Sequence, residues 1–352
     1  MIRYLKAMIA AKRLVTLGGK IEGEIPVLRV WNEGELVKLA LPIGPDTLPA
    51  GLQSMFWDSR EGHSLVFPVE ESSSSERIYA VQRNFGKKAN KGDKVWLSGW
   101  TGEVPDDFNL KGVYEVSLSN GTLAYRMDAG SKWVVHVHGR NASRAETLRN
   151  FKAIQQAEFT QLSISLESDL EPSGLGTRRS ALATTEWKEV ETAIRYAYGQ
   201  GAEQVVLFGF SLGAMIIGEC LRRSSLGQSV AAVVFDSPLI DFESTLELQA
   251  LKAGQPKGFA NYSLSQMVTS RLFRVLGLGI PYLPTLIRNL GRPALIFYSD
   301  VDGYVSMEKI PLLQALNKSG VFVSFPGGRH CRLYNQEPER YSNELVKFLK
   351  RL

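Results

Sequence analysis

From about residue 130 to the end of the chain, apolar runs of strand length alternate with segments whose apolar residues recur at helical spacing. Runs such as Val205 to Phe208 are continuously apolar, which is typical of strands buried on both faces of a sheet. Strands that alternate with helices predict a parallel sheet with right-handed crossovers. The expected strands are Trp133–Val137, Gln161–Leu166, Gln204–Phe208, Ala231–Phe235, Ala294–Tyr298 and Val321–Phe325, and the expected helices are Ser143–Ala157, Thr185–Tyr198, Ser211–Arg223, Met307–Leu316 and Glu337–Leu352.

A long insertion interrupts this α/β pattern. About 58 residues separate the strand that ends at Phe235 from the strand that begins at Ala294, far more than an ordinary connection contains. The insertion is mostly helical by its apolar period. We therefore expect an α/β core made of residues 111–236 and 293–352, with a helical cap at residues 237–292.

The first third of the chain carries short strand signals, separated by clusters of Gly, Pro, Asn, Asp and Ser. These signals predict a β-rich N-terminal domain at residues 24–110, and the turn Asn120-Gly121 predicts a hairpin just after it. Four of the six tryptophans lie in the first third. Such residues usually form the core of a small β unit, and a stacking platform for a sugar or a lipid is the alternative. They are Trp31, Trp57, Trp96 and Trp100.

The net charge of +5 is concentrated at the N-terminus. Residues 1–20 contain five basic residues and no acidic one, namely Arg3, Lys6, Lys12, Arg13 and Lys20. The other 36 basic residues balance the 36 acidic ones, so no basic nucleic-acid groove is expected. We expect residues 1–23 to form a basic helix or tail. Such a helix either packs with a solvated basic face or contacts a membrane surface through residues 1–20.

Cysteine usage and the N-terminus favour a cytoplasmic location. Cys220 and Cys331 are too few for a disulfide framework, and no pair has the spacing of a zinc or redox motif. Basic residues interrupt any apolar segment of a signal peptide, and no uncharged apolar stretch reaches the ~18 residues that span a bilayer. We expect a cytoplasmic protein, peripheral to the membrane if the N-terminal helix contacts lipid.

A serine occupies a turn between a strand and a helix. In Gly209-Phe210-Ser211-Leu212-Gly213, the glycines two residues before and after Ser211 leave room for neighbouring backbone. The helix that follows places free N–H groups and partial positive charge beside the hydroxyl. These features predict a nucleophile at Ser211, supported by Gly209 and Gly213. The alternative is a glycine-rich turn whose serine caps the helix.

Only one of the four histidines follows Ser211 along the chain, and it is His330. In nucleophile sites of this type the chain order is serine, acid, histidine, so His330 is the expected general base. The loop after Tyr298 is expected to supply the acid. We prefer Asp302, because in sites of this type the acid usually stands three residues before the valine that starts the next helical turn, and Val305 has that position here. Asp300 in the same loop and Asp236 after the preceding strand are the alternatives.

Such a site also needs two backbone donors for a developing oxyanion. The first expected donor is the N–H of Leu212, directly after the nucleophile. The second is the N–H of Arg140, in the loop after the strand that ends at Val137. Gly139 permits close approach of the backbone there, and His138 is expected to order the loop by hydrogen bonding rather than to react.

These motifs together resemble the α/β-hydrolase superfamily over residues 111–352. More narrowly, His136-Val137-His138-Gly139-Arg140 and Asp236-Ser237-Pro238 are similar to segments of little-characterised actinobacterial α/β-hydrolases. The segments Glu186-Trp187, Gly201-Ala202 and Ser98-Gly99-Trp100 share this similarity, and those proteins also carry a β-rich N-terminal extension. The resemblance implies a mostly parallel eight-stranded sheet flanked by helices, a catalytic triad, and no cofactor or metal.

We therefore expect a serine hydrolase that cleaves a carboxylic ester, or a related acyl bond, of a small-molecule substrate through an acyl-enzyme. The apolar, glycine-containing segment Val275–Pro284 either covers that substrate and excludes water or belongs to a rigid, packed cap. Two alternatives stay open: a peptidase that resembles the prolyl-oligopeptidase branch, and a binding protein that keeps the fold without the chemistry.

Overall fold

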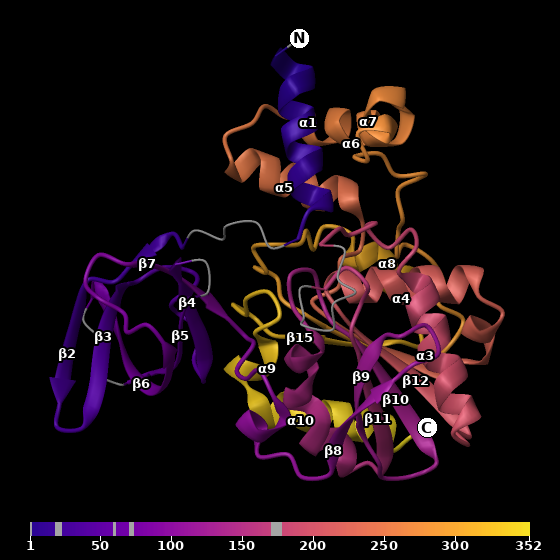
Figure 1. The fold of residues 1–352 in the computed structure, drawn as a ribbon, viewed down its shortest axis with the longest axis horizontal. Coiled ribbons are helices and arrows are strands. Elements are labelled where there is room, and N and C mark those ends of the chain that lie inside the picture. Colours follow the sequence, from indigo (N-terminus) through magenta and orange to yellow (C-terminus); the bar gives the residue numbers. More distant parts are fainter. Residues whose placement is uncertain (1, 18–22, 59–60, 70–73, 170–177) are drawn as a thin grey trace.

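The computed structural model describes residues 2–17, 23–58, 61–69, 74–169 and 178–352 (Figure 1). An eight-stranded sheet runs through the C-terminal two thirds of the chain, in the order β8-β9-β11-β10-β12-β13-β14-β15. β9 is antiparallel to β8 and β11, and the other six strands are parallel. The strands are β8 (Val113–Ser117), β9 (Leu123–Met127), β10 (Lys132–Val137), β11 (Phe159–Ile164), β12 (Gln204–Phe210), β13 (Ala232–Asp236), β14 (Ala294–Tyr298) and β15 (Val321–Ser324).

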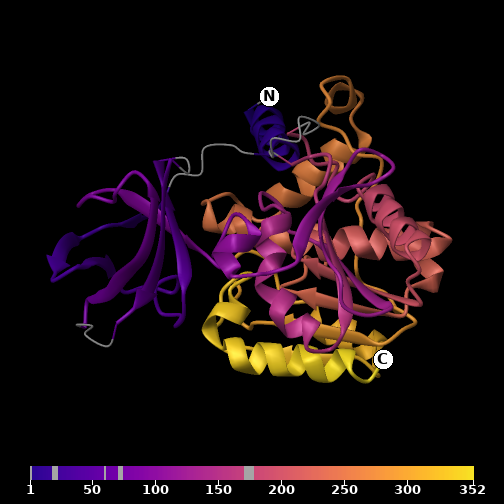
Figure 2. The same cartoon turned by 60° about the horizontal axis from the view of Figure 1, so that its bottom comes forward.

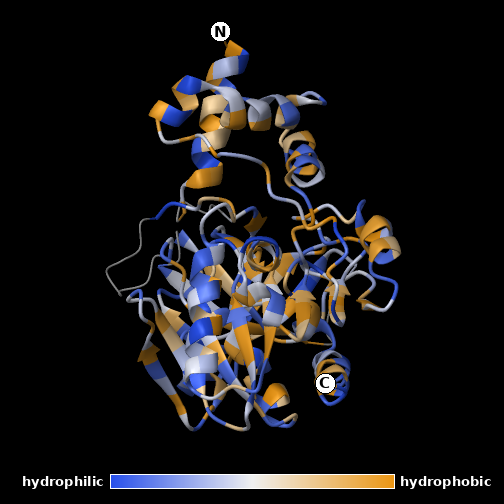
Figure 3. Ribbon diagram, turned by 90° about the vertical axis from the view of Figure 1, so that its right-hand side faces the viewer, coloured by the Kyte–Doolittle hydropathy of each residue, from blue (hydrophilic) through white to orange (hydrophobic). Residues whose placement is uncertain are grey.

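Helices cover both faces of this sheet because successive strand residues point to opposite sides. Val205 and Leu207 of β12 pack on one side with α3 (Trp187–Gly199), α4 (Leu212–Arg223) and α8 (Ile310–Leu316). Val206 and Phe208 pack on the other side with α2 (Phe151–Gln155), α9 (Leu333–Gln336) and α10 (Pro338–Leu349). Figure 2 shows α10 lying along that second face, and Figure 3 shows hydrophobic residues gathered on the central strands.

The segment after β10 differs from the expected helix over Ser143–Ala157. It forms a 3₁₀ helix over Arg144–Asn150, followed by the short α2. The hydroxyls of Thr147 and Ser163 both donate to the carbonyl oxygen of Arg144, at 3.1 and 2.9 Å. Because side chains occupy this oxygen, they compete with the backbone bonds that would extend an α-helix through the first turn.

The N-terminal region forms a separate antiparallel sheet of seven strands, in the order β1-β7-β4-β5-β6-β3-β2. One face buries a hydrophobic core that contains Trp57, Tyr79 and Leu39. Trp57 is therefore a core residue, as expected for a small β unit. The strands are β1 (Ile25–Pro26), β2 (Arg29–Glu33), β3 (Leu36–Pro42), β4 (Gln53–Trp57), β5 (Gly62–Pro68), β6 (Glu76–Gly86) and β7 (Lys94–Ser98).

Helix α1 (Ile2–Val15) packs on the insertion that follows β13, although the two are far apart in sequence (Figure 1). The insertion contains α5 (Phe242–Lys252), α6 (Phe259–Thr269) and α7 (Arg271–Val275). The hydroxyl groups of Tyr4 and Ser270 lie 2.8 Å apart, and the Tyr4 ring meets Phe273 edge-on. No helix in the described part of the chain has the length and apolar character needed to cross a membrane.

Candidate active site

Ser211 lies on a strained turn between β12 and α4. Its φ of 50° and ψ of −115° are unfavourable for a residue with a side chain. Neighbouring backbone approaches the two flanking positions so closely that only glycine fits there. A Cβ on Gly209 would lie 2.7 Å from the nitrogen of Ala214, and one on Gly213 would lie 2.2 Å from the carbonyl oxygen of Val137. The side chain of Ser211 makes no capping hydrogen bond to α4. The capping alternative is therefore wrong for this serine.

Three side chains far apart in the sequence form one chain of hydrogen bonds. Ser211 Oγ lies 2.9 Å from His330 Nε2, and His330 Nδ1 lies 2.8 Å from Asp302 Oδ2. The backbone N–H of His330 also donates to the carbonyl oxygen of Asp302, at 3.3 Å. In the neutral tautomer that fits these distances, Nδ1–H donates to Asp302 and Nε2 accepts from Ser211.

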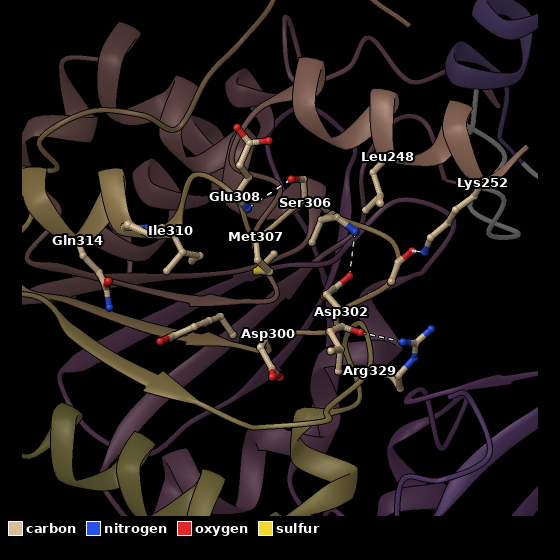
Figure 4. Close-up of a pocket in the computed structure, with 15 residues that line it drawn as sticks. Leu248, Lys252, Asp300, Asp302, Ser306, Met307, Glu308, Ile310, Gln314 and Arg329 are labelled. Atoms are coloured by element: carbon tan, nitrogen blue, oxygen red, sulfur yellow. Dashed lines mark hydrogen bonds between the residues drawn. The ribbon is translucent and has the colours of Figure 1, made fainter. Parts of the chain in front are cut away.

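Of the three candidate acids, Asp302 is the one that contacts His330. Its other oxygen, Oδ1, accepts hydrogen bonds from the N–H groups of Tyr304 and Val305, at 2.9 and 2.8 Å, which fix the buried carboxylate in place. Figure 4 shows the side chains of Asp302 and Asp300. Asp300 instead accepts from the N–H of Gly327 at 3.0 Å.

Asp236, the third candidate, lies in a different contact network. It accepts hydrogen bonds from the hydroxyls of Tyr341 and Ser237, at 2.7 and 2.8 Å. Burial raises the pKa of its carboxyl, and Arg149 opposes that rise. Asp236 therefore stabilises the packing of α10 against the sheet rather than orienting the imidazole.

The environment of His330 shifts its pKa upward. Burial lowers the pKa of the imidazole, but the nearby Asp302 carboxylate and its hydrogen bond raise it, so that the net pKa lies above the ordinary histidine value. The Asp302 carboxylate thus favours the imidazolium that forms when His330 accepts a proton. This is the electrostatic requirement for a base that must take a proton from a serine hydroxyl.

The loop after β10 packs directly against Ser211. A Cβ on Gly139 would lie 3.2 Å from Ser211 Cβ, so the backbone approaches the serine as closely as a glycine allows. Among the described residues, no hydrogen-bond acceptor is found for the backbone N–H groups of Arg140 and Leu212. Both N–H groups are therefore available, and their role in holding an oxyanion stays a prediction.

His138 holds this loop through two hydrogen bonds. Its Nδ1 lies 2.8 Å from the carbonyl oxygen of Gly139, and its Nε2 lies 2.9 Å from Asp169 Oδ2. Burial lowers the pKa of the imidazole, but Asp169 raises it to about 9 overall. At neutral pH both ring nitrogens therefore carry protons and donate, which orders the loop that carries Gly139.

Glu146 is a site residue that the sequence reasoning missed. Its buried carboxylate accepts a hydrogen bond from the N–H of Gly139 at 3.1 Å, and it lines the same cavity as Ser211. The side chain therefore gives this loop a further anchor besides the one that His138 provides. Its sequence signal is weak, because an isolated glutamate in a helical segment usually faces solvent.

The N-terminal domain contacts the loop that carries His330. Arg332, only 3% exposed, donates to Asp46 Oδ1 at 2.5 Å and to Gln53 Oε1 at 2.9 Å. Arg329 donates to the same Asp46 oxygen at 3.0 Å. Burial raises the pKa of Asp46, but the two guanidinium groups lower it below its ordinary value. Residues on both sides of His330 are thus anchored to a separate sheet.

The segment that leaves the N-terminal sheet is also packed against this loop. The carbonyl oxygen of Gly99 accepts a hydrogen bond from buried Arg149 at 2.9 Å. A Cβ on Gly99 would lie 2.1 Å from the carbonyl oxygen of Cys331. The absence of a side chain at Gly99 therefore lets the interdomain segment pass between Arg149 and the histidine loop.

A cavity of about 450 Å³ borders Ser211 and His330. Four parts of the chain contribute to its walls: the α/β core, the N-terminal sheet, the insertion with α5, and Leu14 of α1. The segment Val275–Pro284 does not line it, so the alternative in which this segment covers the substrate is wrong. The apolar lining residues are Leu14, Phe56, Trp96, Leu97, Trp100, Ala142, Leu182, Leu212, Leu239, Phe242, Leu246 and Val305.

Asp302 also lines a second cavity (Figure 4). Asp300, Glu308 and Arg329 line it, but Ser211 and His330 do not. In the described part of the chain, no cluster of three or more His, Cys, Asp and Glu side chains is arranged to hold a metal ion.

Comparison with solved structures identifies the architecture as the α/β-hydrolase fold. Two crystal forms of the Pyrococcus furiosus esterase Pf2001 match it at 17% sequence identity, with TM-scores of 0.52 and 0.51. Each match covers 71% of this chain, and 96% and 94% of the esterase chains. No family model matches the sequence, and no curated protein does. At this identity the likeness establishes the fold alone.

Proposed function

We propose that this protein is a serine hydrolase that cleaves a carboxylic ester through an acyl-enzyme. The observation that carries the proposal is the continuous hydrogen-bonded chain from Ser211 through His330 to Asp302. Nucleophile, base and orienting acid each stand at hydrogen-bond distance from the next, which is the geometry that nucleophilic catalysis by serine requires. The α/β-hydrolase fold supports the same assignment.

In the acylation step, His330 Nε2 takes the proton from Ser211 Oγ as that oxygen attacks the ester carbonyl carbon. The C=O electron pair moves onto oxygen, where the N–H groups of Leu212 and Arg140 donate to the negative charge. Collapse of this intermediate breaks the bond to the alcohol oxygen, which receives the proton from His330. The products are an acyl-serine and a free alcohol.

Deacylation repeats these steps with water. His330 removes a proton from water, the hydroxide oxygen attacks the acyl carbon, and collapse returns the proton to Ser211 Oγ with release of the carboxylic acid. Asp302 holds the imidazole in the tautomer that accepts at Nε2 and stabilises the transient imidazolium. No cofactor is needed for either half of this cycle.

The cavity supports a substrate with an apolar acyl or alcohol group. Most of its lining side chains are aliphatic or aromatic, and they lie beside the attacking oxygen. A peptidase would use the same triad on an amide, so the two activities are separated by experiment. We take the ester as the substrate because of this apolar wall and because an ester demands less leaving-group activation.

Hydrolysis of ethyl butyrate by purified wild type, Ser211→Ala and Ser229→Ala tests the proposal, with an aminoacyl amide assayed in parallel. Ser229 is an exposed serine remote from the cavity and serves as the control. We expect ester turnover in wild type and Ser229→Ala and at least a 10³-fold loss in Ser211→Ala. Preferred turnover of the amide would favour the peptidase. Equal activity of Ser211→Ala would refute the proposed nucleophile.

A further inference from the structure

A ladder of aromatic rings covers one face of the N-terminal sheet. Trp96 of β7, Phe56 of β4, His63 of β5 and Phe85 of β6 are paired in register across four strands. Neighbouring ring centroids lie 5.3, 4.2 and 4.6 Å apart, with interplanar angles of 23°, 20° and 14°. Because side chains alternate between faces, this ladder lies opposite the core that contains Trp57. The ladder is therefore not part of the sheet's own core.

Trp96 is the end of this ladder. β1 pairs with β7 at Val95 and Lys94, and within the described residues no β1 residue pairs with Trp96. Phe56 stacks on the Trp96 ring from the side of β4. Trp96 is partly exposed and lines the cavity that also contains Ser211. The stack thus ends at the wall of the candidate active site.

The wall that the insertion supplies contains one aromatic residue, Phe242 of α5. Helix α5 contributes Leu246, and the segment before it contributes Leu239. Trp100 lies beside the end of the ladder, with its ring 6.3 Å from that of Phe56 and tilted by 51°. A ligand group in this space therefore meets the rings of Phe56, Trp96 and Trp100, together with Phe242, Leu239 and Leu246 of the insertion.

We propose that Trp96 is a substrate-binding residue that stacks on an aromatic ring of the ester, so that the substrate extends the ladder. The inference rests on the proposed function, because the ligand is placed by its ester at Ser211. Offset ring stacking is favourable at centroid separations of 4.5–7 Å and adds to the burial of apolar area. The substrate class is an ester with an aromatic acyl or alcohol group, and Trp96 selects it over a saturated ring of similar size.

Matched esters test this specificity. Ethyl phenylacetate and ethyl cyclohexylacetate compare the two ring types on the acyl side, and benzyl acetate and cyclohexylmethyl acetate compare them on the alcohol side. Ethyl acetate carries no ring. We expect wild type to show a higher kcat/KM for the aromatic member of at least one pair, and Trp96→Ala to lower that value about tenfold. Turnover of ethyl acetate should change less than about twofold.

Two further variants separate stacking from structure. Trp96→Phe keeps a ring and should recover most of the aromatic preference. Trp31→Ala removes a tryptophan of the same sheet that lies under Arg29 and does not line the cavity, so it should leave the preference unchanged. The inference would be overturned if Trp96→Ala lowered kcat/KM equally for all five esters, or for none of them.

Sulfonyl fluorides give a readout that does not depend on turnover. We expect phenylmethanesulfonyl fluoride to inactivate wild type faster than methanesulfonyl fluoride does, and Trp96→Ala to reduce this ratio. Reaction at Ser211 without any aromatic preference would refute the stacking site and leave the proposed function intact. Failure of wild type both to react and to hydrolyse any ester would refute the proposed function, and the substrate assignment with it.

Discussion

Asp46, in the loop after β3, forms an ion pair with Arg332, two residues past His330, with 2.5 Å between carboxylate and guanidinium. The pair joins the N-terminal sheet to the loop that carries the proposed catalytic base. Arg329, on the other side of His330, contacts the same carboxylate. The N-terminal sheet is thus placed to position the base as well as to form a wall of the cavity.

Asp46→Asn should therefore reduce both stability and turnover. Removing the carboxylate leaves the buried Arg332 without its charged partner, which destabilises the folded protein. Because Asp46 is partly exposed, this loss of stability is limited. We expect the free energy of unfolding to fall by about 1–2 kcal/mol and kcat to fall about tenfold through misplacement of His330. Denaturant unfolding and ester turnover measure the two effects.

Asp58→Asn is the matched control, because Asp58 pairs with Lys87 on the same domain and both side chains are exposed. It should change neither the free energy of unfolding nor kcat measurably. A kcat for Asp46→Asn equal to that of wild type would show that the ion pair is a surface attachment with no influence on His330.

Gly139→Ala should impair the reaction without unfolding the protein. The added Cβ would lie 3.2 Å from Ser211 Cβ and 3.4 Å from the carbonyl oxygen of Phe210, so either the serine or the loop after β10 must shift. We expect kcat to decrease about ten- to a hundredfold. Gly199→Ala, with open space around the added atom, should behave as wild type. Equal turnover of both variants would argue against the proposed oxyanion loop.

The pH dependence of kcat/KM should follow the protonation of His330. The base must be neutral to accept the Ser211 proton, so activity is low at acidic pH and rises as the imidazole loses its proton. Because the Asp302 carboxylate raises the pKa of His330 above the ordinary histidine value of about 6.5, the midpoint of this rise should lie above it.

Asp302→Asn tests the cause of that shift. The substitution removes the negative charge, so the midpoint should move to lower pH, and kcat should fall by about 10³–10⁴-fold because the tautomer is no longer fixed. An unchanged midpoint in this variant would show that Asp302 does not control the protonation of His330.

The outer face of α1 is suited to an anionic membrane surface. Ile2, Leu5 and Ile9 are 73%, 57% and 50% exposed on the side opposite the buried Ala7 and Ala11. Exposed basic residues flank them, namely Lys6, Lys12 and Arg13. Apolar side chains bordered by cations favour adsorption to anionic lipid. Contact of the N-terminal helix with a membrane, as opposed to a merely solvated face, stays a prediction.

Co-sedimentation with phosphatidylserine vesicles measures this adsorption. We expect wild type to pellet with the vesicles, less so at high salt, and the triple variant Ile2→Ser/Leu5→Ser/Ile9→Ser to stay in the supernatant. This variant keeps the buried face of α1, which deletion of the helix would not. Leu48→Ser changes an equally exposed leucine of the N-terminal domain and is the control. Equal pelleting of the triple variant and wild type would contradict the prediction.

Much of the α/β core follows from local sequence. The apolar runs of β10 to β14 are almost entirely buried, and such continuous apolar runs predict strands covered on both faces. Ser211 and the His330 loop follow β12 and β15, and parallel strands of one sheet place their carboxyl ends along one edge. The approach of the serine and the histidine is therefore a consequence of topology.

The domain contacts could not be predicted in this way. Asp46 and Arg332 are individually ordinary charged residues, and no period or spacing in the sequence connects them. The same holds for Glu146, whose role depends on a 3₁₀ segment that buries it beside Gly139. Trp96 is the clearest example of a role that the sequence does not predict. The sequence identifies an aromatic residue there, but not which face of the sheet meets the cavity.

Reaction of native protein with a fluorophosphonate probe, followed by mass spectrometry of the labelled peptide, tests the central claim most directly. We predict stoichiometric phosphonylation at Ser211 in wild type, no labelling in Ser211→Ala, and labelling slowed by several orders of magnitude in His330→Ala. Wild-type protein that stays unlabelled, or that is labelled at another serine with Ser211 unmodified, would contradict the account.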